Sequence, residues 1–210
     1  FITLHPAMLA GLQLRFHARF DAEEVVAALV GATLFAGVPT YYTRLLATPR
    51  FGRAACASVR LFISGSAPLL ESTFHEFTAR TGQVILERYG MTETGINTSN
   101  PLRGERRPGA VGVPLQGVQV RVVNEHGMAI AQGDIGEIEV RGPNVFLGYW
   151  LLPEQTAGAF SADGFFRTGD QGRFDSDGYL HIVGRSKDMI ISGGLNVYPK
   201  EIESELDEFN

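Results

Sequence analysis

The stretch ERYGMTETG, at residues 87–95, gathers more kinds of polar side chain than a simple turn needs. Tyr89 offers a flat face to a nucleobase, and Gly90 lets a ligand approach the backbone closely. Thr92 offers a hydroxyl to a phosphate, and the carboxylate of Glu93 offers hard oxygen atoms to Mg²⁺. These residue types predict a loop that binds a nucleotide and its metal ion. A helix N-cap at Thr92, with Glu93 as an acid of the first turn, is the competing interpretation.

Two other stretches carry groups suited to a nucleotide. The loop SGSAP, residues 64–68, follows a short apolar segment, and its small residues let an anion meet backbone N–H groups. In the stretch TGD, residues 168–170, the two carboxylate oxygens of Asp170 match the neighbouring hydroxyls of a ribose, and Arg185 is suited to a hydroxyl or a phosphate. Taken singly, each stretch is explained almost as well by a tight turn.

Helical signals flank these stretches in the first half of the chain. Asp21 begins DAEEVVAALV, and Glu24 follows three residues later, which is the spacing of a capping box. A second helix is predicted in TYYTRLLATP, with Thr40 as its N-cap and an end before Pro49. The segment LLESTFHEFTART is predicted to form a third helix that ends at Gly82.

Short apolar segments lead directly into the polar stretches. VRLFIS, residues 59–64, and QVILERY, residues 83–89, are predicted strands. The alternation of strands and helices is typical of an α/β sheet, whose ligands usually lie at the carboxyl ends of the strands. We therefore expect an α/β subdomain over residues 1–108 that carries the nucleotide- and acid-binding loops.

A different pattern begins near Gly109. VQVRVV and GEIEVRG alternate apolar and polar residues between glycine and proline turns, as in a small antiparallel sheet or barrel. We expect this antiparallel β subdomain over residues 109–184. In the last segment, residues 185–210, Pro199 has the position of the first residue of an acidic helix.

The composition limits the classes of function. Of the 210 residues, 44% are hydrophobic and 20% are charged, so the chain is expected to bury a core of ordinary size. The net charge of -5 and the even spread of Lys and Arg argue against nucleic acid as a partner. The single cysteine, Cys56, excludes an internal disulfide and favours a reducing compartment such as the cytoplasm. No apolar run reaches the roughly 18 residues of a membrane span.

The motifs, taken in their order, resemble one family. SGSAP, ERYGMTE, GEIEVRGPNVFLGYW, FRTGD and GRSKDMIISGGLNVYPKEIE resemble the adenylate-forming (AMP-binding) superfamily of acyl-CoA synthetases, luciferases and peptide-synthetase adenylation domains. Within it, GVPTYYTRLL, SGSAPL, ERYGMTET and NTSNP look most like malonyl-CoA synthetases. The resemblance implies part of a large N-terminal domain, followed from residue 185 by a hinge and the start of a small C-terminal domain.

The resemblance also implies ATP, Mg²⁺ and coenzyme A, because these enzymes convert a carboxylate to an acyl-adenylate from which the CoA thiol displaces AMP. Thr92 and Glu93 would be the catalytic pair, with Glu93 linked to the metal. Lys187 would be the hinge, and Gly193 and Gly194 would lie in a loop on the CoA side. The residues implied in ATP or AMP binding are Gly65, Ser66, Ala67, Pro68, Tyr89, Gly90, Met91, Thr92, Asp170 and Arg185.

A resemblance to malonyl-CoA synthetases implies a small dicarboxylic acid, malonate or methylmalonate, as the substrate. One carboxylate reacts while the other stays ionised, and an ionised group buried without partners is strongly unfavourable. Arg44, Ser66 and Arg88 match the residues that hold this second carboxylate. Arginine suits the role because its planar fork donates two parallel hydrogen bonds. For Arg44, a solvated position on a helix is the alternative.

Other functions stay open on the sequence. They are a CoA ligase for another small acid, an amino-acid adenylation domain, and a nucleotide-binding fragment without catalysis. Two parts of the family pattern, a lysine-bearing phosphate loop and a later adenylation lysine, are not found in these 210 residues. We therefore expect the sequence to be the middle of a longer synthetase and to have no ligase activity alone.

Overall fold

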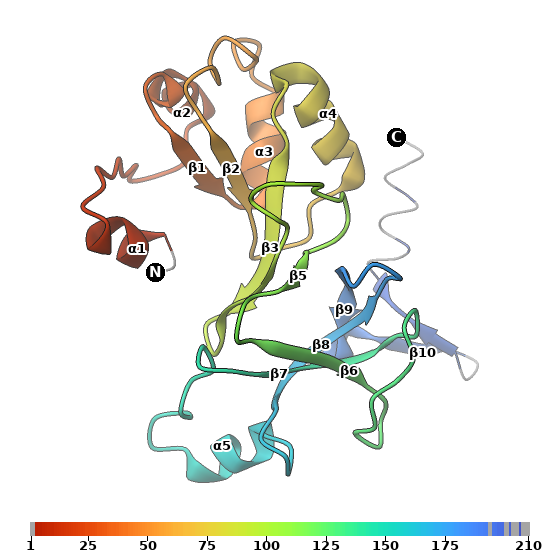
Figure 1. Cartoon of the computed structure of the whole chain (residues 1–210). Helices are drawn as coiled ribbons and strands as arrows, with labels where there is room; N and C mark the ends of the chain where they lie inside the picture. Colours follow the sequence, from red (N-terminus) through yellow and green to blue (C-terminus); the bar gives the residue numbers. More distant parts are fainter. Residues whose placement is uncertain (1–2, 193–194, 200–201, 203–205, 207–210) are drawn as a thin grey trace. The chain divides into compact units, whose positions relative to one another are not determined.

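The structure is a computed structural model that describes residues 3–192, 195–199, 202 and 206 (Figure 1). Its helices are α1 (Leu4–Leu9), α2 (Ala22–Leu29), α3 (Pro39–Leu46), α4 (Glu71–Thr81), α5 (Pro153–Ala159) and the 3₁₀ turn η1 (Ser186–Asp188). Its strands are β1 (Leu34–Gly37), β2 (Leu61–Ser64), β3 (Ile85–Met91), β4 (Gly95–Ser99), β5 (Val113–Pro114), β6 (Gln119–Val123), β7 (Gly136–Arg141), β8 (Phe166–Phe174), β9 (Leu180–Arg185), β10 (Ile190–Ser192) and β11 (Leu195–Val197). Within the described ranges, no helix has the length and apolarity to span a bilayer.

The chain divides into two compact units, Phe1–Leu86 and Glu87–Asn210. In the first unit, β1 and β2 pair in parallel, from Leu34 opposite Leu61 to Gly37 opposite Ser64. Helices α2, α3 and α4 gather about these strands (Figure 1). A parallel pair with helical connections is the arrangement expected of an α/β subdomain.

The predicted N-cap residue is correct for α2 and wrong for α3. Asp21 is the N-cap of α2, and its Oδ1 accepts a hydrogen bond of 3.0 Å from the backbone N–H of Glu24, as predicted. The predicted cap of α3 is wrong, because Val38 occupies the N-cap position and Thr40 lies inside the helix. Pro39 is the cause, since its fixed φ and missing N–H suit the first helical position.

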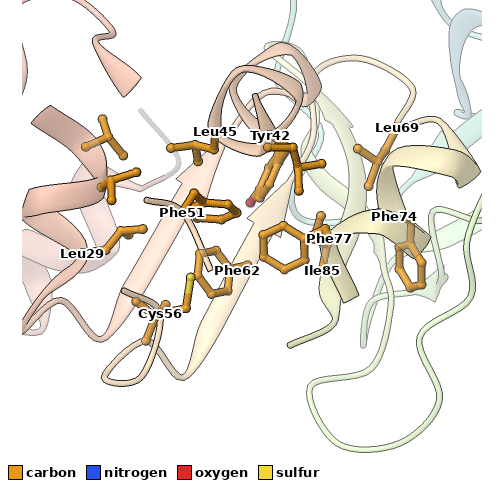
Figure 2. Close-up of a cluster of buried hydrophobic side chains, with 14 residues drawn as sticks. Leu29, Tyr42, Leu45, Phe51, Cys56, Phe62, Leu69, Phe74, Phe77 and Ile85 are labelled. Atoms are coloured by element: carbon orange, nitrogen blue, oxygen red, sulfur yellow. The ribbon is translucent and has the colours of Figure 1, made fainter. Parts of the chain in front are cut away.

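The core of the first unit is largely aromatic and aliphatic (Figure 2). Phe62 of β2 and Phe77 of α4 are fully buried, and their ring centroids lie 4.9 Å apart in an edge-on arrangement. Tyr42 of α3 joins this cluster and donates its hydroxyl to the carbonyl of Ile63 at 2.6 Å. Burial raises the pKa of the Cys56 thiol to about 11, so this cysteine packs as an apolar residue.

The stretch ERYGMTETG forms a β-hairpin rather than a loop. Residues 87–91 belong to β3, the turn covers residues 92–94, and β4 follows in antiparallel pairing. The interpretation of Thr92 as a helix N-cap is therefore wrong. Gly90 is required by the hairpin itself, because a Cβ there would lie 1.8 Å from the carbonyl oxygen of Gly95.

The second unit also contains the predicted antiparallel sheet, in the order β6-β7-β8-β9 (Figure 1). The two alternating segments pair as β6 and β7, from Gln119 opposite Arg141 to Val123 opposite Glu137. Within the described residues this sheet is open, with β6 and β9 at its edges, and not a closed barrel. The stretch TGD lies inside β8 instead of forming a connecting turn. Pro199 is helical, as predicted.

Candidate active site

The second unit brings three residues of the predicted nucleotide site together: Asp170 and Arg185 of its β6-β7-β8-β9 sheet, and Tyr89 of β3. Register places Asp170 of β8 opposite Arg185 of β9. The Asp170 carboxylate accepts a hydrogen bond of 2.5 Å from the Tyr89 hydroxyl at Oδ2 and one of 2.7 Å from Arg185 Nε at Oδ1. Asp170 is 6% exposed, and each of its oxygens keeps a further lone pair for a ligand hydroxyl.

The hydrogen bonds from Tyr89 and Arg185 orient the Asp170 carboxylate. Burial, followed by the neighbouring Asp170 charge, raises the pKa of the Tyr89 hydroxyl far above its usual range, so Tyr89 stays a proton donor. The hydrogen bond to Asp170 raises the pKa of Arg185. Thr168 supports the backbone, since its Oγ1 donates to the carbonyl of Ile138 at 2.7 Å and accepts from the Asp170 N–H at 3.1 Å.

The turn of the β3–β4 hairpin presents Thr92 and Glu93. Thr92 is exposed and Glu93 is half-buried. The segment after β7 holds Glu93 at two points: the Phe146 N–H donates to its carbonyl at 2.8 Å, and the Tyr149 hydroxyl donates to its Oε1 at 3.2 Å. Burial and the Glu93 carboxylate raise the pKa of Tyr149, so this phenol also remains a donor.

A second residue of the same segment supports the far side of the turn. The side-chain nitrogen of Asn144 donates to the carbonyl of Thr94 at 2.7 Å and to that of Ile96 at 3.2 Å. It also lies 3.1 Å from Oδ1 of the fully buried Asn97. The turn therefore has a fixed frame, although its tip carries exposed polar groups.

In the first unit, the loop SGSAP leaves β2 with an unusual backbone. Ser66 has a φ of 72°, a left-handed conformation that is uncommon for a non-glycine residue. Such strain costs about 1–3 kcal/mol and is most often found at functional sites. Ser66, Ala67 and Pro68 are exposed, whereas Gly65 is half-buried. The Oγ of Ser64 is buried and lacks a hydrogen-bond partner among the described residues.

The two arginines predicted to bind a carboxylate have different surroundings. Arg44 is exposed on α3, where its guanidinium lies 4.7 Å from the ring centroid of Phe20 and donates to the Phe20 carbonyl at 3.5 Å. Arg88 is half-buried on β3. Met91, also predicted at the nucleotide site, ends β3 opposite Gly95.

The predicted hinge lies in the 3₁₀ turn η1, which connects β9 to β10. Lys187 is exposed in the middle of this turn. Gln171 of β8 donates a hydrogen bond of 2.6 Å to the hydroxyl of Ser186, the first residue of the turn. Short 3₁₀ segments often serve as connectors or hinges. Gly193 and Gly194, predicted on the CoA side, lie outside the described residues.

The described part of the chain offers few ligands for a metal ion at the predicted position. Across the described residues, no group of three or more His, Cys, Asp and Glu side chains is placed to hold one. Glu93 alone supplies a carboxylate at the predicted position, with Oε1 already accepting from Tyr149. This suits Mg²⁺, which often binds one or two carboxylates together with substrate phosphates and water.

Comparison with known proteins identifies the family. The profile of AMP-binding enzymes matches residues 1–150, and the chain belongs to this family. The ATP-bound MatB structure from Rhodopseudomonas palustris is 55% identical with a TM-score of 0.93, over 96% of this chain and 40% of its own. Malonate–CoA ligase of Arabidopsis thaliana is 44% identical over 183 residues, 83% of this chain and 30% of the relative. Feruloyl-CoA synthase of an Amycolatopsis species is 40% identical over 205 residues, 96% of this chain and 41% of the relative.

These comparisons confirm the resemblance drawn from the motifs and the α/β fold class. The chain spans between 30% and 41% of the length of the relatives it matches. Sequence reasoning missed Thr168, Asn144 and Tyr149. The signal for Asn144 and Tyr149 was present in GPNVFLGYW, a stretch that contributed to the resemblance without a role for any of its side chains.

Proposed function

We propose that this chain is part of an ATP-dependent acid–CoA ligase that acts on malonate or methylmalonate. The observation that carries the proposal is the identity of 55% with the ATP-bound MatB structure, over 96% of the chain. The name of the Arabidopsis relative supports malonate as the acid and CoA as the acceptor. A reducing compartment such as the cytoplasm suits its single buried cysteine.

The nucleotide half of the proposal rests on the trio of Tyr89, Asp170 and Arg185. A buried carboxylate whose two oxygens are already fixed by donors is preorganised for the two hydroxyls of a ribose. Thr92 would donate its hydroxyl to a phosphate, and Glu93 would bind the Mg²⁺ that accompanies ATP. The strained backbone of Ser66 supports a ligand-binding role for the SGSAP loop.

The acid half of the proposal assigns the spare carboxylate of malonate to Arg44, Ser66 and Arg88. Arg88 is the strongest member, because it is half-buried and its fork suits a carboxylate. Arg44 is exposed and stacks on Phe20, so its role requires its guanidinium to leave or share that contact.

The proposed reaction has two steps. A carboxylate oxygen attacks the α-phosphate, the bond to the β-phosphate breaks, and pyrophosphate leaves. The CoA sulfur then attacks the acyl carbon, its proton passes to solvent, and AMP leaves with the electrons of the carbon–oxygen bond. The bound Mg²⁺ would neutralise phosphate charge in the first step, while Lys187 would be the hinge between the steps.

A ligase for another acid is the second candidate, because feruloyl-CoA synthase is 40% identical to this chain. The test uses the full-length polypeptide that contains the chain and compares pyrophosphate release with malonate, methylmalonate, acetate, ferulate and benzoate. We expect malonate or methylmalonate to give the highest kcat/KM. A preference for ferulate, acetate or benzoate would contradict the proposal. The 210 residues alone are expected to form no malonyl-CoA.

Replacement of one arginine tests the acid site separately. Arg88→Ala is expected to raise the KM for malonate by about 30-fold, which corresponds to about 2 kcal/mol, and to change the KM for ATP little. Arg60→Ala, on an exposed position of the first unit, is the matched control. Equal increases in both KM values would assign Arg88 to the nucleotide site.

A further inference from the structure

The hydrogen bond from Tyr149 to Glu93 is the one described contact that fixes the Glu93 carboxylate. It joins two residues 56 positions apart in the sequence, at 3.2 Å between the phenol oxygen and Oε1. The phenol donates to one oxygen and leaves the other without a described protein partner. A carboxylate that binds a metal is usually oriented by such a second hydrogen bond.

The segment that carries Tyr149 is itself built to fix this side chain. The backbone N–H of Tyr149 donates to Oγ1 of Thr156 in α5 at 2.8 Å, and that hydroxyl donates to the carbonyl of Leu152 at 2.9 Å. Gly148 must be glycine here, because a Cβ would lie 2.5 Å from Cγ2 of Thr156. The segment also contains strain, since Leu151 has a φ of 57°.

Aromatic packing fixes the ring of Tyr149. The ring centroid lies 4.8 Å from that of Phe146 in an edge-on arrangement, and Phe146 packs against the buried Phe166 at 5.3 Å. Phe146 also donates its N–H to the Glu93 carbonyl. The backbone and the carboxylate of Glu93 are thus held by the same short segment.

We propose that Tyr149 is a positioning residue that orients the Glu93 carboxylate toward the Mg²⁺ ion of the nucleotide substrate. The proposal rests on the proposed function only in taking Mg-ATP as the ligand. Tyr149 binds neither substrate itself; it acts through Glu93. Loss of the phenol hydroxyl lets the carboxylate rotate, so the affinity for Mg-bound nucleotide falls while the site for the nucleoside is unchanged.

The test is Tyr149→Phe in the full-length polypeptide, because phenylalanine keeps the ring packing. Calorimetry is expected to show about tenfold weaker binding of Mg²⁺ with a non-hydrolysable ATP analogue, and unchanged binding of AMP without metal. In pyrophosphate release, the Mg²⁺ requirement rises about tenfold at an unchanged KM for malonate. Tyr179→Phe is the control, since it also removes one phenol hydrogen bond, to the Glu105 carbonyl at 3.1 Å.

A double-mutant cycle separates positioning from folding. In a Glu93→Gln background, Tyr149→Phe is expected to weaken Mg-nucleotide binding less than twofold further, because the two residues act through one contact. Equal losses for AMP and Mg-nucleotide, or a full tenfold loss in the Glu93→Gln background, would overturn the proposal. If the wild-type protein releases no pyrophosphate with any acid, the proposed function fails, while the calorimetric arm still tests Tyr149.

Discussion

The two units of the chain bury different kinds of side chain. The first unit packs aromatic and aliphatic residues, and its buried polar residues are Thr48, Ser64, Thr73 and Thr81. Among the described residues, the buried charged side chains Glu87, Glu139 and Asp170 all lie in the second unit. A buried charge adds little net stability, and perturbed or buried ionisable groups gather at functional sites. The interior of the first unit is therefore apolar or neutral, whereas the second unit must accommodate buried carboxyl groups, and the proposed ribose ligand Asp170 is one of them.

Each buried charge with described contacts in the second unit has a cation as partner. Glu139, 1% exposed, lies 2.6 Å from Arg121 and 3.6 Å from Arg167. Asp170 is paired with Arg185 at 2.7 Å. Because Glu139 is fully enclosed by its partners, it is structural, whereas Asp170 keeps acceptor capacity for a ligand. A carboxylate paired with arginine therefore occurs twice within one sheet, and only the pair of Asp170 and Arg185 belongs to the proposed nucleotide site.

The largest effect is expected from the core of the first unit. Phe77→Ala should destabilise that unit by about 4 kcal/mol, because it removes a fully buried ring and leaves a cavity. Hydrogen exchange of backbone amides in α4 and β2 measures the loss locally. Phe16→Ala, at a position 74% exposed, is the control and should change little. A loss below about 1.5 kcal/mol for Phe77→Ala would mean that the core collapses into the gap.

The next largest effect is expected from the loss of one tyrosine hydroxyl, compared between a tyrosine of each unit. Tyr89→Phe removes a hydrogen bond to a carboxylate and should cost about 2 kcal/mol, whereas Tyr42→Phe removes one to a neutral carbonyl and should cost about 1 kcal/mol. Amide exchange in β3 and in α3 reports the two losses. Tyr89→Phe should also weaken AMP binding, because Asp170 loses one of its two fixed donors, and Tyr42→Phe should not. Equal effects of the two changes on AMP binding would remove the functional distinction between the units.

A smaller effect is expected where the sequence predicted the structure directly. Asp21→Ala removes the N-cap of α2 and should cost about 1 kcal/mol, while Asp21→Asn should keep most of the stability. Exchange of the amides in the first turn of α2 measures both variants. If Asp21→Ala leaves those amides protected, packing of α2 and not its cap determines where the helix begins.

Sequence patterns predicted the parts of the fold that depend on near neighbours. The Asp21 cap and the end of α4 at Gly82, where φ is 75°, follow from residues within a few positions. Thr40 was the wrong cap because Pro39, one position earlier, is the stronger signal. The turn and second strand of the hairpin at residues 87–95 were missed because this stretch lacks the apolar–polar alternation of a half-buried strand, and its polar Glu87 is buried.

The sequence also predicted only part of the candidate site, because residue types can be read one at a time but contacts between distant segments cannot. Tyr89, Asp170 and Arg185 were singled out one by one from their chemistry. Strand register then places Asp170 opposite Arg185, and a side-chain hydrogen bond joins Tyr89 to Asp170. The contact of Tyr149 with Glu93 was not predictable, since it depends on how the segment after β7 returns to the hairpin turn. The spacing of neighbouring residues does not predict a contact between side chains 56 positions apart.

The smallest effect is expected from the ionised side chain of Glu137, which is half-buried in the second unit. Burial and the nearby Glu139 raise the pKa of Glu137, although the Gly169 N–H and Arg167 oppose the shift. A raised pKa means that the folded state disfavours the ionised form, so Glu137 lowers stability above its folded pKa and has no such effect once protonated.

Glu137→Gln, which imitates the protonated form, is therefore expected to stabilise the second unit by about 0.5 kcal/mol at pH 7, a small value because the group is half-exposed and screened. The gain should disappear as the pH falls toward the ordinary value of 4.5. Thermal denaturation from pH 4 to pH 7 measures this difference, with exposed Glu76→Gln of the first unit as the control. If the two variants gave the same pH dependence, the charge of Glu137 would carry no electrostatic cost in the folded second unit, and its partial burial beside Glu139 would be fully offset by Arg167 and the Gly169 N–H.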